Sequence, residues 1–360
     1  MSGYLCPDYL CPACRAPVQR QAESWHCAAC GKTYPILFGI PDFRLAPDPY
    51  LSLAEERAKA ARLHAFAQDH SFAETVAEYY RITDDVPPAM ARRFAAYVHA
   101  GAARGQGVLD RLDGPELAAG PLLDAGCGAG GLVLAAARGS GGDAGGGAGP
   151  SVTGLDIALR WLVIARKRLD EAGVQADLVC ADIAAPPFAE GRFARIAALD
   201  LFDHLPDQSG AAQTLHALLR PGGRLFATGA NRYTLAPYPL AGLWGVGFLP
   251  AGLRRRYVIW RRGLDTLRHA RLTAPHGLAG LLRRAGFGGL TVRALDIPPD
   301  RMQSGQIQSG SRLEKFTLRL YRHLRTVPVI RGLMVLTGPA FEIQAQKISA
   351  PPGASYIDQG

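Results

Sequence analysis

The chain contains little cysteine and no segment typical of export. Seven of its 360 residues are cysteine, and an odd number is a poor basis for a disulfide framework. No charged-then-apolar leader opens the chain, so a cleaved secretion signal is not expected. Together these absences predict a protein of the reducing cytoplasm.

Charge is absent from one long stretch, residues 233–253. Its length suggests a membrane span, but it holds three prolines and four glycines, so a continuous spanning helix is not expected. Five arginines follow it: Arg254, Arg255, Arg256, Arg261 and Arg262. Two interpretations fit this pattern. The segment lies against an anionic bilayer or an amphiphilic ligand, or it is a buried insertion with a solvated basic face.

The overall composition is that of a folded, basic protein. A hydrophobic content of 48% can fill a core and excludes a disordered chain. The length allows one large or two smaller domains. A net charge of +9 and a pI near 9.3 predict an anionic partner, such as nucleic acid, a phospholipid surface or an acidic small molecule. An arginine-rich proteome, with no such partner, is the alternative explanation.

Four of the cysteines form two Cys-x-x-Cys pairs separated by twelve residues. These are Cys11, Cys14, Cys27 and Cys30. The spacing predicts one tetrahedral zinc ion, which is structural because four sulfur ligands leave no open position. A segment this short buries too little surface to fold alone, so the metal supplies its stability. Cys6 and His26 are expected to be bystanders.

The stretch LLDAGCGAGG, residues 122–131, is the centre of the remaining chain. It predicts a buried strand that ends near Asp124, a tight turn, and the start of a helix. The turn glycines, Gly126, Gly128 and Gly130, supply unusual φ angles and let a ligand approach the backbone. Nicotinamide and flavin folds use a similar turn, so this motif alone does not identify the ligand.

Further strands follow at the spacing of alternating β and α elements. VTGLDIA ends near Asp156, and DLVCADI ends near Asp182. An apolar run at 194–205 and the turn and strand RPGGRLFATG at 220–229 continue the pattern. We predict an α/β, doubly wound, mostly parallel seven-stranded sheet whose strand-end acids face one ligand crevice.

Residues 108–229 resemble the class I S-adenosylmethionine-dependent methyltransferases. A nicotinamide fold needs its ribose acid about twenty residues past the glycines. The glycine-rich segment 139–150 delays that acid, so spacing alone does not exclude such a fold. The combination of Asp182 with RPGGRLF favours the methyltransferases. One departure is Ala194, where many relatives carry an acid.

The resemblance implies S-adenosyl-L-methionine as cofactor and assigns its contacts. The first acid and the glycine turn would hold the methionine part, the second acid the ribose hydroxyls, and the third the adenine amine. The implied cofactor set is Asp124, Gly126, Gly128, Gly130, Asp156, Ile157, Asp182, Ile183 and Asp200.

The cysteine segment and its continuation, GKTYPILFGIPDF at 31–43, resemble the small zinc-ribbon proteins that activate methyltransferases, here fused in cis. Such a ribbon would stabilise the catalytic domain or position a substrate. Zinc ribbons also bind RNA, but few aromatic and basic residues surround this one.

Residues 49–112 show helical periodicity and predict a lid or platform, divided at Pro87-Pro88. Tyr79 and Tyr80 are candidate acceptor contacts, although they could equally pack a helix interface. Tyr233, in the uncharged stretch, is a third candidate.

Methyl transfer to oxygen or carbon needs a positioned nucleophile and usually a base. The pair Asp203-His204, just beyond the fourth strand, is the catalytic candidate, because an imidazole has a suitable unperturbed pKa. The alternative is an ordinary helix start. LDLFDHLPD lacks the Asp/Asn-Pro-Pro-aromatic motif of nucleobase amino-methyltransferases, which disfavours exocyclic amine methylation.

The C-terminal third predicts a helix and sixth strand at 272–297, a basic amphipathic helix at 312–333, an antiparallel edge strand at 339–347, and a loose tail. The predicted divisions are a zinc ribbon at 1–46, a helical lid at 47–107, a cofactor-binding core at 108–230, a lid insertion at 231–271, a C-terminal part at 272–348, and the tail at 349–360.

The sequence therefore predicts a cytoplasmic methyltransferase. The acceptor would be a hydrophobic or amphiphilic small molecule, quinone-like, lipid-linked or a natural-product intermediate, methylated on oxygen or carbon. The uncharged stretch and its arginines leave a peripheral membrane contact open, and an obligate protein partner is not expected. The alternatives are an RNA methyltransferase, marked by strong salt dependence, and a non-catalytic scaffold.

Overall fold

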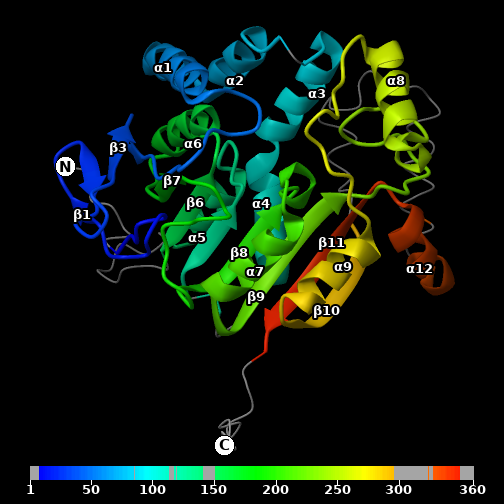
Figure 1. Ribbon diagram of the computed structural model, residues 1–360. Coiled ribbons are helices and arrows are strands. Elements are labelled where there is room, and N and C mark those ends of the chain that lie inside the picture. The colour runs from blue at the N-terminus through cyan, green and yellow to red at the C-terminus, as the bar shows by residue number, and fades with distance from the viewer. Residues whose placement is uncertain are drawn as a thin grey trace, which may run out of the picture.

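A seven-stranded sheet forms the centre of the computed structural model, which describes residues 8–84, 86–112, 117–118, 120–140, 151–295, 323 and 327–348 (Figure 1). The strand order is β10-β11-β9-β8-β5-β6-β7. The strands are β5 (Leu122–Ala125), β6 (Val152–Asp156), β7 (Asp177–Cys180), β8 (Phe193–Leu199), β9 (Leu219–Ala230), β10 (Phe287–Ala294) and β11 (Ala340–Lys347). β5 to β9 are parallel, which confirms the predicted fold class.

The chain reverses its direction of travel across the sheet at β5. It moves outward from β5 to β6 and β7, then returns to place β8 on the other side of β5. In open sheets of this kind, ligands bind at the carboxyl ends of the strands beside such a switch point. The topology therefore places the glycine turn after β5 at the expected ligand position.

The predicted edge strand at 339–347 lies inside the sheet instead. β11 pairs antiparallel with β9 on one side and with β10 on the other, so β10 forms the edge. The predicted edge position of this strand was wrong, because the prediction depended on Pro339. That proline precedes the ladder, where its missing N–H removes no strand hydrogen bond.

Helices cover both faces of the sheet because the parallel strands are apolar on both faces. One group of buried side chains joins the sheet to α1, α2, α4, α5 and α6. A second group joins it to α7 and α9. The covering helices are α4 (Gly101–Leu112), α5 (Gly131–Ser140), α6 (Leu159–Glu171), α7 (Gln208–Leu218) and α9 (Pro275–Arg284).

Three helices before α4 lie along one end of the sheet: α1 (Leu53–Asp69), α2 (Phe72–Arg81) and α3 (Pro88–His99) (Figure 1). Capping boxes start the first two, with Ser52 and Glu55 before α1 and Ser71 and Glu74 before α2. α3 begins at Pro88, which confirms the predicted division at the proline pair.

An N-terminal β-module, residues 8–44, packs beside β7 (Figure 1). Its sheet has the order β1-β2-β3-β4, formed by β1 (Gln19–Arg20), β2 (Ser24–His26), β3 (Thr33–Leu37) and β4 (Ile40–Pro41). The Phe43 N–H donates to the Cys180 carbonyl at 2.7 Å, which attaches the module to the edge of the main sheet. Tyr9, Trp25 and Phe43 share one core with Phe188 of the main domain.

The segment 231–271 has a small core of its own, built on Tyr238, Leu243 and Val258. It contains η2 (Val246–Phe248) and α8 (Ala251–Arg262), and α12 (Pro328–Thr337) lies on the same side of the molecule in Figure 1. Among the described residues, no helix combines the length and apolarity needed to cross a bilayer. The predicted tail and most of the glycine-rich segment and of the helix at 312–333 lie outside the described residues.

Candidate active site

A cavity of about 960 Å³ lies where the carboxyl ends of β5, β6 and β8 meet the helices before α4. All four strand-end acids of the predicted cofactor set line it, namely Asp124, Asp156, Asp182 and Asp200. Ile157, Ile183, Gly126 and Gly128 line it as well. The parallel topology thus brings together residues that are up to 76 positions apart, from 124 to 200.

The three turn glycines have positive φ angles, but they serve different purposes. A Cβ at Gly128 would meet no atom within 4 Å, so the backbone there is open to a ligand. A Cβ at Gly130 would lie 2.9 Å from the Ala165 Cβ, so this glycine allows α5 to approach α6. Gly130 itself is absent from the cavity lining, although Ala129 and Gly131 on either side of it line the cavity, so its assignment to cofactor binding stays a prediction.

Asp124 and Asp156 carry the unusual charge environment of the site. Asp124 is 2% exposed, and burial together with the Asp156 charge raises the pKa of its carboxyl to about 7. Burial also raises the pKa of Asp156, although that carboxylate accepts hydrogen bonds from the N–H groups of Gly128 and Ala158, each at 2.8 Å. Two acids near one cavity favour a ligand that carries positive charge and donors.

Asp200 ends β8 in a left-handed backbone conformation, with φ at +54°. Its N–H donates to the Thr228 hydroxyl at 3.0 Å, and that hydroxyl donates to the Asp200 carboxylate at 2.9 Å. The Tyr97 hydroxyl from α3 donates to the other carboxylate oxygen. A strained residue held by several bonds at a cavity wall is typical of functional positions.

Asp203 lies elsewhere. It is buried, and its carboxylate accepts from the Thr273 hydroxyl, the Thr273 N–H at 3.2 Å and the Ala230 N–H at 3.1 Å. It does not line the cavity. We correct its catalytic assignment: Asp203 joins the turn after β8 to the end of β9 and to the segment before α9.

His204 does line the cavity. Its Nδ1 is hydrogen-bonded to the Tyr50 hydroxyl at 2.8 Å, and the Tyr50 ring packs edge-on against His269 with centroids 4.7 Å apart. The His204 side chain is exposed at the cavity wall, and desolvation by the neighbouring protein lowers the pKa of its imidazole. At neutral pH the ring is therefore uncharged and can accept a proton.

Three residues of this wall, Tyr50, Tyr97 and His269, were missed by the sequence analysis. They come from the link before α1, from α3 and from the end of the lid insertion. No motif marks any of them, because their meeting depends on how these segments pack over the sheet.

Tyr79 and Tyr80 both line the cavity, and Tyr79 also packs against Trp161 with ring centroids 4.2 Å apart. Tyr233 lies outside it, on the surface, with its ring 5.8 Å from that of Phe248. Its assignment as an acceptor contact is corrected, because the lid insertion presents Leu240 and residues 264–266 and 268–270 to the cavity instead.

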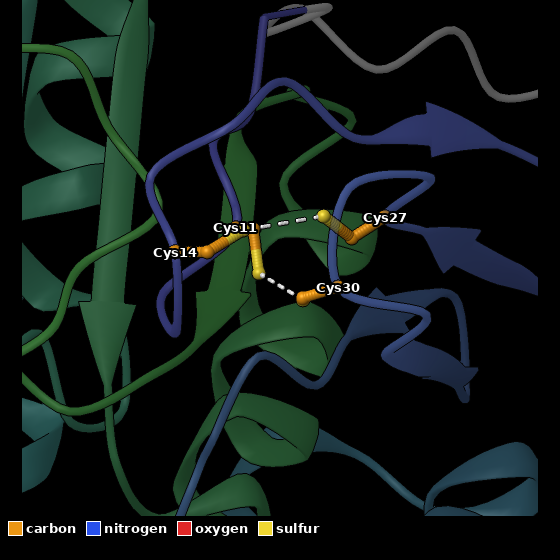
Figure 2. A group of neighbouring side chains, drawn as sticks. All are labelled: Cys11, Cys14, Cys27 and Cys30. Carbon is orange, nitrogen blue, oxygen red and sulfur yellow. Dashed lines mark hydrogen bonds between the residues drawn. The ribbon is translucent and has the colours of Figure 1, made fainter.

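The four predicted metal ligands gather in the N-terminal module (Figure 2). Their sulfur atoms all lie within 4.8 Å of one another, with 3.6 Å between Cys11 and Cys30 and 3.5 Å between Cys14 and Cys27. Tetrahedral zinc–thiolate bonds would separate the sulfurs by about 3.8 Å. The Tyr34 hydroxyl lies 3.0 Å from the Cys11 Sγ. The cluster has the donor set and size that such an ion requires.

Comparison with known proteins agrees with this architecture. Residues 122–223 match a family model described as a methyltransferase domain. The ubiquinone biosynthesis O-methyltransferase of Chromobacterium violaceum is 29% identical over 195 residues, which are 53% of this chain and 75% of that protein. The ubiquinone biosynthesis O-methyltransferase of Xanthomonas euvesicatoria is 35% identical over 175 residues. These are 48% of this chain and 64% of that protein.

A solved structure, phosphoethanolamine N-methyltransferase 2 of Haemonchus contortus in complex with S-adenosyl-L-methionine, is 16% identical with a TM-score of 0.45. It covers 71% of this chain, and the chain covers 57% of it. The family match, the curated relatives and the strand-end acids around one cavity agree. The chain contains a class I methyltransferase domain and is an S-adenosylmethionine-dependent methyltransferase.

Proposed function

We propose that this enzyme methylates an oxygen of a hydrophobic, hydroxylated small molecule of quinone-like type. The observation that carries the proposal is the His204 imidazole at the cavity wall, hydrogen-bonded through Nδ1 to the Tyr50 hydroxyl. Apolar side chains from α3 and the lid insertion line the same cavity, including Met90, Phe94, Leu240 and Leu264. The two relatives, both named ubiquinone biosynthesis O-methyltransferase, support oxygen as the acceptor atom.

The cofactor fits the residues at the other side of the cavity. Open space above Gly128 leaves room for a ligand against the backbone, and the carboxyls of Asp124 and Asp156 suit a ligand with cationic and hydroxyl groups. When bound, S-adenosylmethionine supplies an electrophilic methyl group. Asp124, Asp156 and Asp182 would hold it, and Asp200 would face the junction between cofactor and acceptor.

His204 performs the proton transfer in this mechanism. In the tautomer in which Nδ1–H donates to the Tyr50 oxygen, Nε2 carries the lone pair and takes the proton of the acceptor hydroxyl. The acceptor oxygen keeps the electron pair of the broken O–H bond and becomes the nucleophile. Tyr50 fixes the orientation of the ring, and the cavity walls limit water at the reacting oxygen.

We also propose that the cysteine cluster holds a structural Zn²⁺. Four thiolates would complete a tetrahedral shell and leave no position for substrate. The Zn²⁺ would stabilise the N-terminal module, as in the zinc-ribbon activators that this module resembles. Reduced thiols are maintained in the cytoplasm, and we propose that compartment for the enzyme.

A peripheral membrane contact completes the proposal. On α8, Leu253, Arg256, Tyr257 and Trp260 follow the i, i+3, i+4, i+7 spacing of one helix face. Leu253 is 54% and Trp260 75% exposed, which is unusual for such large apolar side chains. Exposed apolar groups beside arginines suit the surface of an anionic bilayer, where a hydrophobic acceptor would be found.

Labelled methyl from S-adenosylmethionine, incubated with a cell extract, tests the proposal after partition into organic, nucleic-acid and protein fractions. We expect label in the organic fraction with the wild-type enzyme and none with the Asp124→Ala control. Alkaline-stable label on an oxygen of a hydroxylated aromatic product supports the assignment. Label in nucleic acid contradicts it.

A further inference from the structure

Arg44, the last residue of the N-terminal module, makes an ion pair that is almost completely buried. Its side chain is 1% exposed and that of its partner Asp42 is 2% exposed. The Arg44 Nε and one terminal nitrogen donate to the two Asp42 carboxylate oxygens, each at 2.8 Å. The other terminal nitrogen donates to the carbonyl of Ile157 at 3.2 Å.

That carbonyl belongs to the loop after β6, which lines the cofactor cavity. Asp156, Ile157 and Ala158 all contribute to the cavity wall. The Asp156 carboxylate accepts the N–H groups of Gly128 and Ala158, so the loop is joined to the glycine turn at the cavity. Arg44 holds the same loop from the side of the N-terminal module.

The position of Arg44 depends on the N-terminal module. The neighbouring Phe43 N–H donates to the Cys180 carbonyl at 2.7 Å, and the Phe43 ring packs against Tyr34 with centroids 5.0 Å apart. Tyr34 in turn contacts Cys11 of the cysteine cluster. A continuous path of contacts thus runs from the cluster to the cofactor loop.

The ion pair is poorly explained by stability alone. Removing two charges from water costs about as much as their attraction returns, so a buried pair often adds no net stability over apolar side chains. What an apolar pair could not provide is a donor to the Ile157 carbonyl with a fixed direction. A bidentate carboxylate holds a guanidinium in one plane and aims its remaining N–H groups.

We propose that Arg44 is a positioning residue for the cofactor site: held by Asp42, it fixes the Asp156–Ala158 loop in the conformation that binds S-adenosylmethionine. The N-terminal module thereby supports the cofactor site from outside, because none of its described residues, Arg44 included, lines the cavity. Loss of this donor leaves the loop free to move and weakens cofactor binding.

Calorimetric titration of the full-length, metal-containing protein with S-adenosylhomocysteine tests the proposal. The variant is Asp42→Asn with Arg44→Met, which removes both charges together and leaves no buried ion alone. We expect roughly tenfold weaker binding, the effect of losing one or two hydrogen bonds in a binding site. In turnover, we expect a higher KM for S-adenosylmethionine with kcat nearly unchanged at saturation, and metal content equal to wild type.

Arg57→Met is the matched control. Arg57 also approaches Asp42, at 3.5 Å, but it is 46% exposed and has no bond to the Ile157 carbonyl. It should bind S-adenosylhomocysteine as wild type does. Wild-type affinity in the double variant, or an equal loss in Arg57→Met, would overturn the proposal. Because binding is measured without an acceptor, the result is independent of the proposed O-methylation.

A measurement on the wild-type protein keeps the test open if the double variant does not fold. Coupling between two sites is reciprocal, so S-adenosylhomocysteine should slow hydrogen exchange at the Phe43 amide, which is bonded to Cys180. Exchange in β1 and β2, away from the loop, should change little. Unchanged exchange at Phe43 with saturating ligand would contradict the coupling.

Discussion

Asp124 lines the cofactor cavity, and burial of its carboxylate there lowers the free energy of unfolding. Its carboxyl has a pKa of about 7 in the folded protein, raised by burial and by Asp156, whereas an ordinary aspartate has a pKa near 4. Between these values the folded state binds more protons than the unfolded state. The contribution of Asp124 to the free energy of unfolding of the ligand-free enzyme therefore falls as pH rises from about 4 to 7.

Asp124→Asn removes this penalty. We expect the ligand-free variant to melt at a higher temperature than wild type at pH 8, with a smaller difference at pH 5. The rise in Tm on adding S-adenosylhomocysteine should be much smaller than in wild type, because the carboxylate no longer meets the ligand. Thermal melts at both pH values, with and without ligand, measure this. A Tm difference that is independent of pH would contradict the assigned burial effect.

His204 gives a second prediction at this scale. A base is active when deprotonated, and desolvation lowers the pKa of this imidazole below its usual value of about 6.5. At saturating cofactor and acceptor, kcat should not change with pH near neutrality and should fall only when the pH drops below the usual imidazole pKa of about 6.5. His204→Asn should lower kcat by about 10² to 10⁴ and abolish the acid limb. Tyr50→Phe should lower kcat less and keep the limb. If His204→Asn shows the same decrease of kcat at acid pH as the wild type, His204 is not the base.

At the scale of elements, α4 packs closely against α5, the helix that follows the glycine turn after β5. A Cβ at Gly105 would lie 2.7 Å from the Leu132 Cα and 3.2 Å from the Ala135 Cβ. Gly105→Ala must therefore push the two helices apart, and we expect it to lower the free energy of unfolding by about 1–3 kcal/mol.

Gly107 lies on the same helix, and a Cβ there would meet no atom within 4 Å. Gly107→Ala is the matched control, expected to raise stability by about 0.5–1 kcal/mol through helix propensity. Urea unfolding of both variants gives the comparison. Equal effects from the two substitutions would show that helix packing is not limiting at Gly105.

α8 carries the prediction for membrane binding. Trp260→Ser should reduce sedimentation with anionic phosphatidylglycerol vesicles several-fold, because the exposed indole would no longer be buried at the interface. Ile348→Ser removes a 65% exposed apolar side chain far along the chain and should not reduce binding. Equal binding by wild type and Trp260→Ser would exclude this face of α8 as the contact.

At the scale of the whole molecule, the N-terminal module and the methyltransferase domain share one hydrophobic core. Tyr9, Trp25 and Phe43 of the module lie in the same buried cluster as Phe188 and Phe193. Such continuity favours one cooperative unfolding transition over two. Loss of the proposed zinc should therefore affect the entire protein.

Cys14→Ser should abolish stoichiometric zinc in the purified protein and lower the single melting transition by several degrees, since structural zinc contributes folding free energy directly. Metal analysis by mass spectrometry and calorimetry provide the readouts. Cys6→Ser is the thiol control and should retain both zinc and Tm. If wild-type protein without zinc melts at the same Tm as wild-type protein with zinc, the metal proposal is wrong.

Much of the fold was predictable because it depends on local patterns. Apolar strands that end in an acid, a glycine turn and the proline pair at 87–88 correctly located β5 to β9 and the start of α3. The cysteine spacing predicted a cluster that the structure brings within 4.8 Å. Periodicity and turn chemistry act over a few residues, so these features are visible in a single sequence.

The amino-acid sequence by itself therefore determined the class of fold, the strand-end acids and the cysteine cluster. Only the tertiary structure decided that β11 lies inside the sheet, that Asp203 is structural, that Tyr50 meets His204, and that Arg44 reaches Ile157. The physical reason is distance along the chain. Tyr50 and His204 are separated by 154 positions and Arg44 and Ile157 by 113, and such pairs meet only when separate elements pack together.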